Sequence, residues 1–328
     1  MSKILGYGEI LIRFSVVPSI KFSQEYSKKY IGGAELNSVL SLSTWGHECS
    51  FLSILPNNND GEKILNYLKK NNLCLKNIHS DHNKIGKYFA KNLNSKKNLI
   101  IEYDRKNSGF SKFELDEKII SKALKNKEVL IISGISPALS SLCQKNILRL
   151  IRSAKDRKIK IAYDVNYRSK LWTLERASHF NKEILDNIDF LFANCGTARD
   201  IFGFDLNETK TIDDVTIESK RAIQFLNTIS KFELISFNVR NSIGEDNNLF
   251  GSVIFHDNKF YEGEQVSIEI EDCIGGGDSF LAAVVHGYLN NWEMKKIADF
   301  SSKTFANTHS IQGDHNLSTE LEILNFFK

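Results

Sequence analysis

Residues 272–280 read Asp-Cys-Ile-Gly-Gly-Gly-Asp-Ser-Phe, and a pattern of apolar and small residues typical of a helix follows at once, from Leu281 to Leu289. The bare backbone N–H groups of Gly275, Gly276 and Gly277 can approach an anion, and a helix N-terminus adds partial positive charge. Asp278 falls in the first turn, where its carboxylate could accept a proton from a substrate hydroxyl. The stretch predicts a phosphoryl-transfer site; the alternative is a glycine-rich turn that Asp278 caps.

Around this stretch, short apolar runs alternate with longer amphipathic ones. Repeated alternation of strand and helix predicts an α/β fold with a mostly parallel sheet covered by helices on both faces. Ligands of such sheets bind beyond the carboxyl ends of the strands. We predict strands at Ile4–Tyr7, Ser50–Leu55, Val129–Ser133, Ile159–Asp164, Phe190–Asn194 and Leu234–Asn238, and helices near 34–45, 61–72, 140–154, 175–187 and 216–229.

Residues 12–31 and 86–105 depart from this alternation, because they read as alternating strands without a helix of their own. We predict that they form a small β-sheet that projects from the main body as a lid. Two edge hairpins without a moving role are the alternative. Since no internal repeat and no linker rich in proline or glycine interrupts the chain, we expect residues 1–328 to form a single domain that carries this lid.

The composition, with 41% hydrophobic and 25% charged residues, is that of a soluble globular protein. The net charge is only +3 and the lysines are dispersed among acids, so we expect no nucleic-acid partner. No apolar run approaches the roughly 20 residues of a membrane span, and the N-terminus lacks a signal-peptide core, so we expect no membrane partner. Five scattered cysteines without a Cys-x-x-Cys pair indicate reduced thiols and a cytoplasmic protein.

Two segments could bind a small polar substrate. In Gly32-Gly33-Ala34-Glu35-Leu36-Asn37, the glycines would let substrate hydroxyls lie against the backbone, and Asn37 offers one donor and one acceptor. In Tyr103-Asp104-Arg105, residues two apart face the same side, so Tyr103 and Arg105 can point together into a cleft beneath the lid. The planar fork of Arg105 suits a carboxylate. A plain strand–helix turn and a surface arginine are the respective alternatives.

Two further segments end predicted strands of the main sheet. By the period of a strand, Asp164, Asn166 and Arg168 project to one face of the segment Asp164-Val165-Asn166-Tyr167-Arg168. Asn194 ends the next predicted strand. A polar and charged set at this end of a parallel sheet indicates a ligand site more often than a structural role.

Common nucleotide- and metal-binding signatures are absent from the sequence. There is no Gly-x-x-x-x-Gly-Lys-Ser/Thr phosphate loop, and Gly6-Tyr7-Gly8 lacks the third glycine of a dinucleotide fingerprint. His47-Glu48 has no second histidine four residues on, which excludes the common helical zinc site. The sequence therefore identifies no metal ligand.

In combination, these segments resemble the ribokinase-like (pfkB) carbohydrate kinases, and within them the 2-keto-3-deoxygluconate kinases. Asp272 to Phe280 is similar to the family's C-terminal signature, and Gly32 to Asn37 is similar to its N-terminal di-glycine motif. The segments follow the family's order and span nearly the whole chain. The closer likeness rests on Gly32-Gly33-Ala34-Glu35-x-Asn37, Gly86-x-Tyr88-Phe89, Tyr103-Asp104-Arg105, residues 133–140, Asp164-x-Asn166-Tyr167-Arg168-x-Lys170-Leu171-Trp172 and Gly275-Gly276-Gly277-Asp278-Ser279-Phe280.

The resemblance implies a ribokinase-like three-layer αβα fold with a small β-sheet lid, and it implies roles for individual residues. Asp278 would deprotonate the sugar hydroxyl that attacks the γ-phosphate of ATP, and the amides of Gly275, Gly276 and Gly277 would stabilise negative charge. The sugar acid would be held by Gly32, Gly33, Ala34, Asn37, Tyr88, Tyr103, Arg105, Arg168 and Asp278. The nucleotide would contact Asn166, Arg168, Asn194, Asn238, Arg240, Ser242, Gly275, Gly277 and His309. Mg²⁺ would accompany ATP, and the family allows a monovalent cation and a homo-oligomer formed through the lid.

The chain departs from the family pattern after Asn194, where acidic residues that help to organise magnesium are usual. Here the run is Asn194-Cys195-Gly196-Thr197, and the first carboxylate is that of Asp200. Cys273 also replaces the usual threonine or arginine, and Asn238 stands where threonine is common. The proton acceptor and the glycine turn are both retained.

We predict an ATP-dependent kinase that phosphorylates 2-keto-3-deoxygluconate to its 6-phosphate. One alternative is a kinase of the same fold for a neutral sugar such as fructose. The other is a catalytically weak relative that binds sugar or protein partners as a regulatory module, which the missing acids after Asn194 favour. Arg105 and Arg168 distinguish the first two, because the sugar acid carries a carboxylate that a neutral hexose lacks.

Overall fold

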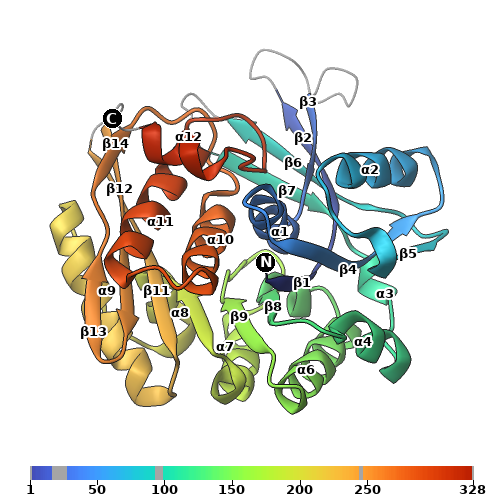
Figure 1. The fold of residues 1–328 in the computed structure, drawn as a ribbon, viewed down its shortest axis with the longest axis horizontal. Helices are drawn as coiled ribbons and strands as arrows, with labels where there is room; N and C mark the ends of the chain where they lie inside the picture. Colours follow the sequence, from blue (N-terminus) through green and yellow to red (C-terminus); the bar gives the residue numbers. More distant parts are fainter. Residues whose placement is uncertain (1, 17–27, 93–98, 244–246, 327–328) are drawn as a thin grey trace.

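The protein, described by a computed structural model over residues 2–16, 28–92, 99–243 and 247–326, consists of a large sheet between two layers of helices and a smaller sheet at one edge. Figure 1 shows the smaller sheet, formed by β2, β3, β6 and β7, standing above the α1 end of the main body. The α/β fold with a mostly parallel sheet, predicted from the alternation of apolar and amphipathic runs, is confirmed.

The main sheet has the strand order β13-β12-β11-β10-β9-β8-β1-β4-β5, with β14 paired to β12. From β5 to β11 all neighbours are parallel, and β12, β13 and β14 add an antiparallel edge. The six predicted strands all belong to the parallel part. The bounds are β1 (Lys3–Tyr7), β4 (Glu48–Pro56), β5 (Ile78–Asp81), β8 (Val129–Ser133), β9 (Lys160–Asp164), β10 (Phe190–Ala193), β11 (Leu234–Ile243), β12 (Asn247–His256), β13 (Lys259–Glu262) and β14 (Val266–Ile268).

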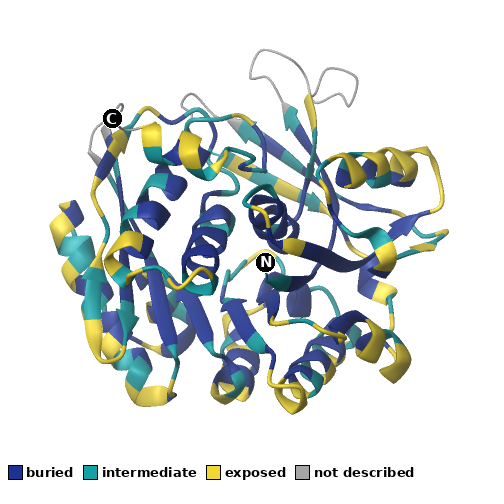
Figure 2. Cartoon of the chain, viewed as in Figure 1, coloured by how far each residue is buried: buried dark blue, intermediate teal, exposed yellow. Residues whose placement is uncertain are grey.

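Helices cover both faces of this sheet, and each face has its own apolar core. One core packs α4, α6, α7, α8 and α9 against the sheet, and the other packs α1, α2, α10 and α11. Figure 2 shows the central strands, α1 and α10 as mostly buried. The bounds are α1 (Ala34–Thr44), α2 (Asn59–Lys70), α3 (Gly109–Lys112), α4 (Glu117–Leu124), α5 (Ile135–Ala138), α6 (Ser141–Asp156), α7 (Leu174–Ile184), α8 (Cys195–Phe202), α9 (Ile212–Ile229), α10 (Gly276–Leu289), α11 (Met294–His309) and α12 (Glu320–Asn325), with 3₁₀ turns η2 (Leu75–Asn77) and η3 (Leu185–Asn187).

The smaller sheet has the order β3-β2-β6-β7 and is formed by the two segments predicted as a lid. β2 (Leu11–Val16) pairs antiparallel with β3 (Lys28–Gly32) and parallel with β6 (Gly86–Asn92), which pairs antiparallel with β7 (Leu99–Asp104). Within the predicted ranges, residues 17–27 and 93–98 lie outside the described residues. Because β3 ends at Gly32 and α1 begins at Ala34, the small sheet leads directly into the main body.

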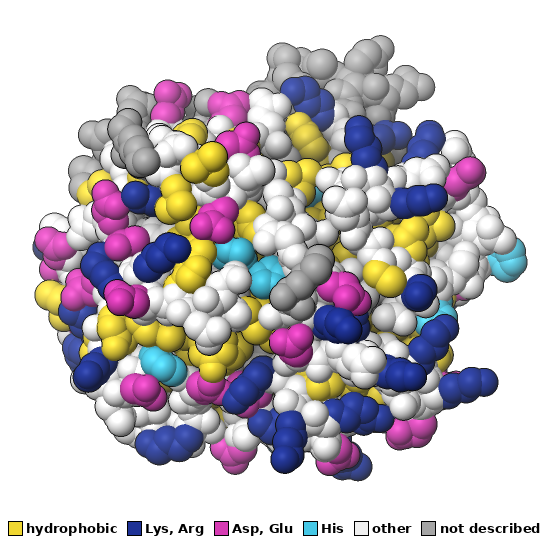
Figure 3. Space-filling model, viewed as in Figure 1, with side chains coloured by type: hydrophobic (Ala, Val, Ile, Leu, Met, Phe, Trp, Pro, Cys, Tyr) yellow, Lys and Arg dark blue, Asp and Glu magenta, His cyan; other side chains and the backbone are white. Residues whose placement is uncertain are grey.

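The outer surface carries both signs of charge. On the face drawn in Figure 3, Lys and Arg side chains stand among Asp and Glu side chains, which agrees with the dispersed charges of the sequence. Within the described residues, no helix combines the length and the apolar character needed to cross a bilayer.

Candidate active site

A cavity of about 350 Å³ opens between the small sheet and the carboxyl ends of the parallel strands. Its wall combines the end of β9 at Asp164, the end of β10 at Ala193 and the start of α10. Tyr88 of β6 and Tyr103 of β7 line it from the small sheet. A pocket at this edge of an open α/β sheet is where such folds bind ligands.

The glycine turn forms the start of α10, as predicted, and its three glycines have different surroundings. Gly275 has a φ of +80°, and a Cβ there would lie 2.2 Å from the carbonyl oxygen of Asp314. A Cβ on Gly276 would lie 2.1 Å from Cε1 of the His309 ring. A Cβ on Gly277 would have Asn238 Nδ2, at 3.9 Å, as its nearest described neighbour. Packing therefore explains the first two glycines, whereas the third keeps the cavity open above the helix start.

The first amides of α10 face this cavity without carbonyl partners inside the helix, as at any helix start. The first intrahelical bond of the turn runs from the amide of Ser279 to the carbonyl of Gly275, at 3.0 Å. Partial positive charge at this end of the helix favours an anion. The turn can therefore receive a phosphoryl group through its backbone.

Asp278 lies beside these amides, and α1 fixes its position. The Nδ2 atom of Asn37 donates to Asp278 Oδ2 at 2.6 Å, and the Ser38 hydroxyl donates to the Asp278 carbonyl at 2.8 Å. Asn37 Oδ1 is buried and has no partner within the described residues, although Asn37 lines the cavity. A ligand hydroxyl could satisfy this acceptor.

Among the carboxyl groups in the cavity wall, those of Asp278 and Asp164 have the most strongly raised pKa values. Burial raises the pKa of Asp278 to about 8, against the hydrogen bond from Asn37 and with a further rise from the neighbouring charge of Asp164. Burial likewise raises the pKa of Asp164 to about 7, although Arg168 and the amide of Asn166 lower it. A carboxyl group that titrates near neutral pH is suited to proton transfer.

Most of the predicted sugar-facing residues line the cavity, from the start of α1 and from the small sheet. Gly33, Ala34, Asn37, Tyr88, Tyr103 and Arg105 all line it. Arg105 as a whole is only 5% exposed, and its Nε and Nη2 atoms donate to Glu9 Oε2 at 2.8 and 2.6 Å. Nη1 is the remaining nitrogen of the fork. Gly32 does not line the cavity; a Cβ there would lie 2.4 Å from Asp314 Oδ2.

Most of the predicted nucleotide-facing residues also line the cavity, from the ends of β9 and β10, from β11 and from α11. Asn166, Arg168, Asn194, Asn238 and His309 line the cavity with Thr197, whereas Arg240 does not and instead lies over the Phe250 ring. Ser242 is a residue of β11, and its side chain lies outside the described part of the structure. Asn194 caps α8 by accepting a bond from the Thr197 amide at 2.9 Å.

One geometric prediction was wrong. Asp164, Asn166 and Arg168 do not share a face by strand period, because β9 ends at Asp164 and Asn166 has a left-handed φ of +38°. All three nevertheless line the cavity. The turn after the strand, and not the strand itself, brings them together.

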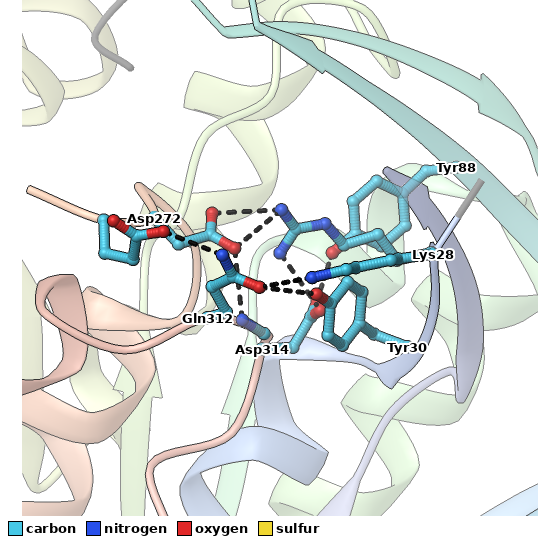
Figure 4. A network of polar contacts seen from close by, with 9 residues as sticks. Lys28, Tyr30, Tyr88, Asp272, Gln312 and Asp314 are labelled. Carbon is cyan, nitrogen blue, oxygen red and sulfur yellow. Dashed lines mark hydrogen bonds and ion pairs between the residues drawn. The ribbon is translucent and has the colours of Figure 1, made fainter. Parts of the chain in front are cut away.

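Sequence reasoning missed a buried ion-pair network on the lid side of the cavity. Arg13 of β2 contacts both Asp272 and Asp314, and the Tyr88 hydroxyl donates to Asp314 (Figure 4). A signal was present, because Arg13 interrupts an otherwise apolar strand pattern, Ile10-Leu11-Ile12-Arg13-Phe14. For Asp314 no pattern in its own segment pointed to the cavity.

The described residues include no group of three His, Cys, Asp or Glu side chains with a geometry for a metal ion. Asp164 is the carboxylate beside the predicted nucleotide-facing residues. The cavity therefore does not suit a metal ion that takes all its ligands from the protein. It does suit a metal ion that is bound mainly by a nucleotide and takes one carboxylate from the protein.

Comparison with known proteins identifies the family. The profile of the pfkB family carbohydrate kinases matches residues 1–236. A 5-dehydro-2-deoxygluconokinase of Clostridium perfringens is 26% identical over 337 residues, which cover 99% of this chain and 91% of that protein. A PfkB family carbohydrate kinase of Listeria grayi is 30% identical, with a TM-score of 0.89 over 99% of each chain. A 2-dehydro-3-deoxygluconokinase of Thermotoga maritima is 25% identical, with a TM-score of 0.91 over 99% of each chain.

The family predicted from the sequence is thus confirmed, and so is the ribokinase-like fold. The site agrees with this result, because a helix start open to an anion lies beside a carboxyl group. The chain belongs to the pfkB family of carbohydrate kinases and is a phosphotransferase that acts on a sugar hydroxyl.

Proposed function

We propose that this kinase uses ATP to phosphorylate a sugar acid, with 2-keto-3-deoxygluconate as the substrate and its 6-phosphate as the product. The observation that carries the proposal is the position of Asp278, which lies beside the open amides of α10 in a cavity that also contains the guanidinium groups of Arg105 and Arg168. Proton acceptor, anion site and cations suited to a substrate carboxylate thus share one cavity.

In the proposed reaction Asp278 takes the proton from the substrate hydroxyl while the oxygen of that hydroxyl attacks the γ-phosphorus of ATP. The bond from that phosphorus to the bridging oxygen breaks, and ADP leaves. The amides at the start of α10 stabilise negative charge on the transferring group, a contribution for which one lost donor costs about 10²–10³ in rate. Because phosphoryl transfer asks the protein mainly for positioning and charge stabilisation, these two elements account for most of the chemistry.

The proposed nucleotide side comprises Asn166, Arg168, Asn194, Asn238 and His309. Burial lowers the pKa of His309 to about 4, so its ring would be neutral at physiological pH and would add no charge beside the phosphates. Mg²⁺ bound with ATP would neutralise phosphate charge, and Asp164 is the protein carboxylate that could share it. Thr197 offers a hydroxyl there in place of an acid.

The proposed sugar side comprises Gly33, Asn37, Tyr88, Tyr103 and Arg105. The names of two relatives, a 5-dehydro-2-deoxygluconokinase and a 2-dehydro-3-deoxygluconokinase, denote sugar acids, which supports the carboxylate. The first name also makes 5-dehydro-2-deoxygluconate a second candidate substrate. The two acids differ in where the carbonyl and the missing hydroxyl lie along the chain.

ADP formation by the purified protein, measured with ATP, Mg²⁺ and a panel of acceptors, tests this proposal. The panel contains both sugar acids, fructose and ribose. We expect kcat/KM to be highest for 2-keto-3-deoxygluconate, with 5-dehydro-2-deoxygluconate next. A preference for fructose would favour the neutral-sugar alternative, and ADP formation at background for every acceptor would favour the regulatory relative.

A further inference from the structure

A continuous polar network joins the small sheet to the segments on either side of the glycine turn (Figure 4). Its outer part connects Lys28 and Tyr30 of β3 with Gln312, whose side chain also bonds to Glu271. Its inner part connects Arg13 with Asp272 and Asp314. The cavity wall includes Tyr88 and Asp314 but neither Arg13 nor Asp272. The network therefore lies mainly behind the site.

Arg13 is the centre of the inner part. Its Nη2 atom lies 3.0 Å from Asp272 Oδ1 and 2.7 Å from Oδ2, and its Nη1 atom lies 3.4 Å from Asp314 Oδ1. The Tyr30 ring covers the guanidinium at 5.1 Å. Arg13, Asp272 and Asp314 are all less than a tenth exposed. One buried cation thus holds two buried carboxylates, each on a different side of the glycine turn in the sequence.

The charges in this group do not balance, because two acids face one arginine. Burial raises the pKa of Asp314 to about 6, while Arg13 and the Tyr88 hydroxyl lower it and Asp272 raises it. Removal of one partner from a buried ion pair leaves an uncompensated charge, which is strongly unfavourable. Without Arg13, the two carboxylates would repel each other and would tend to move apart.

Such a movement would reach the catalytic elements directly. The Asp314 side chain packs against Gly32, and its carbonyl oxygen packs against Gly275, so closely that neither glycine could carry a Cβ. Asp272 also accepts a bond from the Gly313 amide at 3.1 Å. Asp314 therefore lies between the di-glycine motif and the turn that opens α10, and its position sets the spacing of the two.

We propose that Arg13 is a positioning residue of the kinase: by holding Asp272 and Asp314, it fixes the start of α10 relative to the strands that carry the sugar-facing residues. This inference rests on the proposed function, since it assigns Arg13 a part in the same phosphoryl transfer. Arg13 touches neither substrate in this scheme and acts through the backbone of the glycine turn. A misplacement of about 1 Å in a catalytic group can lower a rate by about 10²-fold.

The kinetic test compares Arg13→Met, which keeps the packed stem without the charge, with Arg13→Lys and Asp272→Asn. We expect Arg13→Met to lower kcat by about 10–100-fold, with the KM for ATP changed less than about threefold, because none of the proposed nucleotide-facing residues is a partner of Arg13. Arg13→Lys should recover part of kcat. The double variant Arg13→Met with Asp272→Asn should lose no more than the worse single variant, because the two residues act as a unit.

Arg221→Met is the control for loss of an arginine–carboxylate pair, since Arg221 of α9 bonds to the buried Glu218 at 2.6 Å and does not line the cavity, although its own side chain, unlike that of Arg13, is 43% exposed. It should lower thermal stability without lowering kcat. A kcat of Arg13→Met within twofold of the parent, or additive losses in the double variant, would overturn the inference. If Arg13→Met does not fold, Arg13→Lys and Asp272→Asn give the same decision.

Hydrogen exchange of the backbone amides separates this inference from the proposed function, because it requires no substrate. In Arg13→Met, or in Asp272→Asn if the former does not fold, the amide of Ser279, which closes the first turn of α10 on the Gly275 carbonyl, should exchange at least tenfold faster relative to those of α6, and in Arg221→Met that ratio should not change. An unchanged ratio means that Arg13 does not position the turn. If the parent protein phosphorylates no acceptor, the proposed function is wrong. The exchange ratio still shows whether Arg13 positions the turn.

Discussion

The Nδ2 atom of Asn37 lies 2.6 Å from Oδ2 of Asp278, although 241 positions separate the two residues in the sequence. The contact joins the first turns of α1 and α10, which lie side by side in Figure 1. The Ser38 hydroxyl adds a second bond between the same helices, to the Asp278 carbonyl. One carboxylate oxygen of Asp278 is therefore fixed by α1, which leaves the other for the proton transfer that we propose.

Asp278→Asn should abolish most activity and at the same time stabilise the protein. Loss of a positioned base lowers a rate by about 10²–10⁴-fold, so we expect kcat to fall within that range. The raised pKa of Asp278 means that the folded protein disfavours the charged form, and a neutral amide of the same shape removes that penalty. We expect Tm at pH 8 to rise by about 2–4 °C, the shift that about 1 kcal/mol produces in a domain of moderate size.

Asp299→Asn serves as the control for this pair of measurements. Asp299 lies on α11, pairs with the exposed Lys295 and does not line the cavity. It also accepts a bond from the Glu264 amide at 2.8 Å, which the side-chain oxygen of an asparagine can accept as well, so its substitution should change neither kcat nor Tm appreciably. An Asp278→Asn variant with the parent's kcat would show that another group accepts the proton. A lower Tm in that variant would show that the carboxylate contributes to stability.

The pH dependence of catalysis should follow the two raised carboxyl groups. A base works only when deprotonated, and burial raises the pKa of Asp278 to about 8 and that of Asp164 to about 7. We expect kcat/KM to rise between about pH 6 and pH 9, with apparent pKa values that belong to the interacting pair. A profile that is flat from pH 5.5 to pH 9 would contradict this assignment.

Stability should change in the opposite direction over the same range. Between the unfolded value of 3.8 and the folded value of about 8, the folded protein keeps the Asp278 proton that the unfolded chain has lost. Since the unfolded state then binds fewer protons, the free energy of unfolding falls as pH rises through this window. Tm measured from pH 5 to pH 8 should therefore fall more steeply for the parent than for Asp278→Asn.

The parallel part of the fold could be predicted because its signal is local. Each of the six predicted strands is a short apolar run, and each lies within a few residues of the observed β1, β4, β8, β9, β10 and β11. The antiparallel strands β12, β13 and β14 were not predicted, because Gly251 and Ser252 interrupt the apolar residues of β12 and because β13 and β14 have only four and three residues. β12 pairs with β11, and this pairing cannot be inferred when each segment of the sequence is considered alone.

The candidate site could be predicted where residues carry a motif, and not where they act through distant contacts. Asn37, Tyr103 and Asp278 belong to recognisable segments and all line the cavity. Arg13 and Asp272 are 259 positions apart, and although Arg13 interrupts an apolar strand pattern, neither segment identifies the other as its partner. The pairing of Arg105 with Glu9 was missed for the same reason, because a buried arginine and a surface arginine have the same sequence signature.

Alanine at Gly275 and at Gly277 should have contrasting effects. Gly275→Ala forces a side chain into a left-handed φ of +80° and against the Asp314 carbonyl, so we expect a loss of at least about 1–3 kcal/mol in the free energy of unfolding. Gly277→Ala has open space on the protein side and a better helix former, so stability should be kept or improved.

Although Gly277→Ala should keep its stability, it should lose activity. The Gly277→Ala methyl group occupies the space that the transferring group would use, and we expect kcat to fall at least about tenfold in a well-folded protein. Urea unfolding and kcat measured on the same preparations give both quantities. If Gly277→Ala keeps full activity, the phosphoryl group does not approach this amide.

Arg105→Ala should primarily destabilise the protein, because Arg105 is the buried partner of Glu9. Their side chains are 6% and 2% exposed, and both bonds from Arg105 go to Glu9 Oε2, whereas Oε1 has no partner in the described part of the chain. Breaking a buried pair by removing one partner costs about 3–5 kcal/mol. The double variant Glu9→Gln with Arg105→Ala removes the orphaned charge and should recover most of that loss in urea unfolding.

Recognition of the substrate carboxylate is therefore best measured in a protein that already carries Glu9→Gln, by adding Arg105→Met. With Glu9→Gln present, the change from Arg105 to Met removes a cation without leaving a buried acid unpaired. We expect kcat/KM for the sugar acid to fall about tenfold or more, as for loss of a charged hydrogen bond, with little change for fructose at saturating ATP. Equal losses for both acceptors would mean that Arg105 supports the shape of the cavity and leaves the carboxylate to Arg168, whose own replacement by Met should then produce the selective loss.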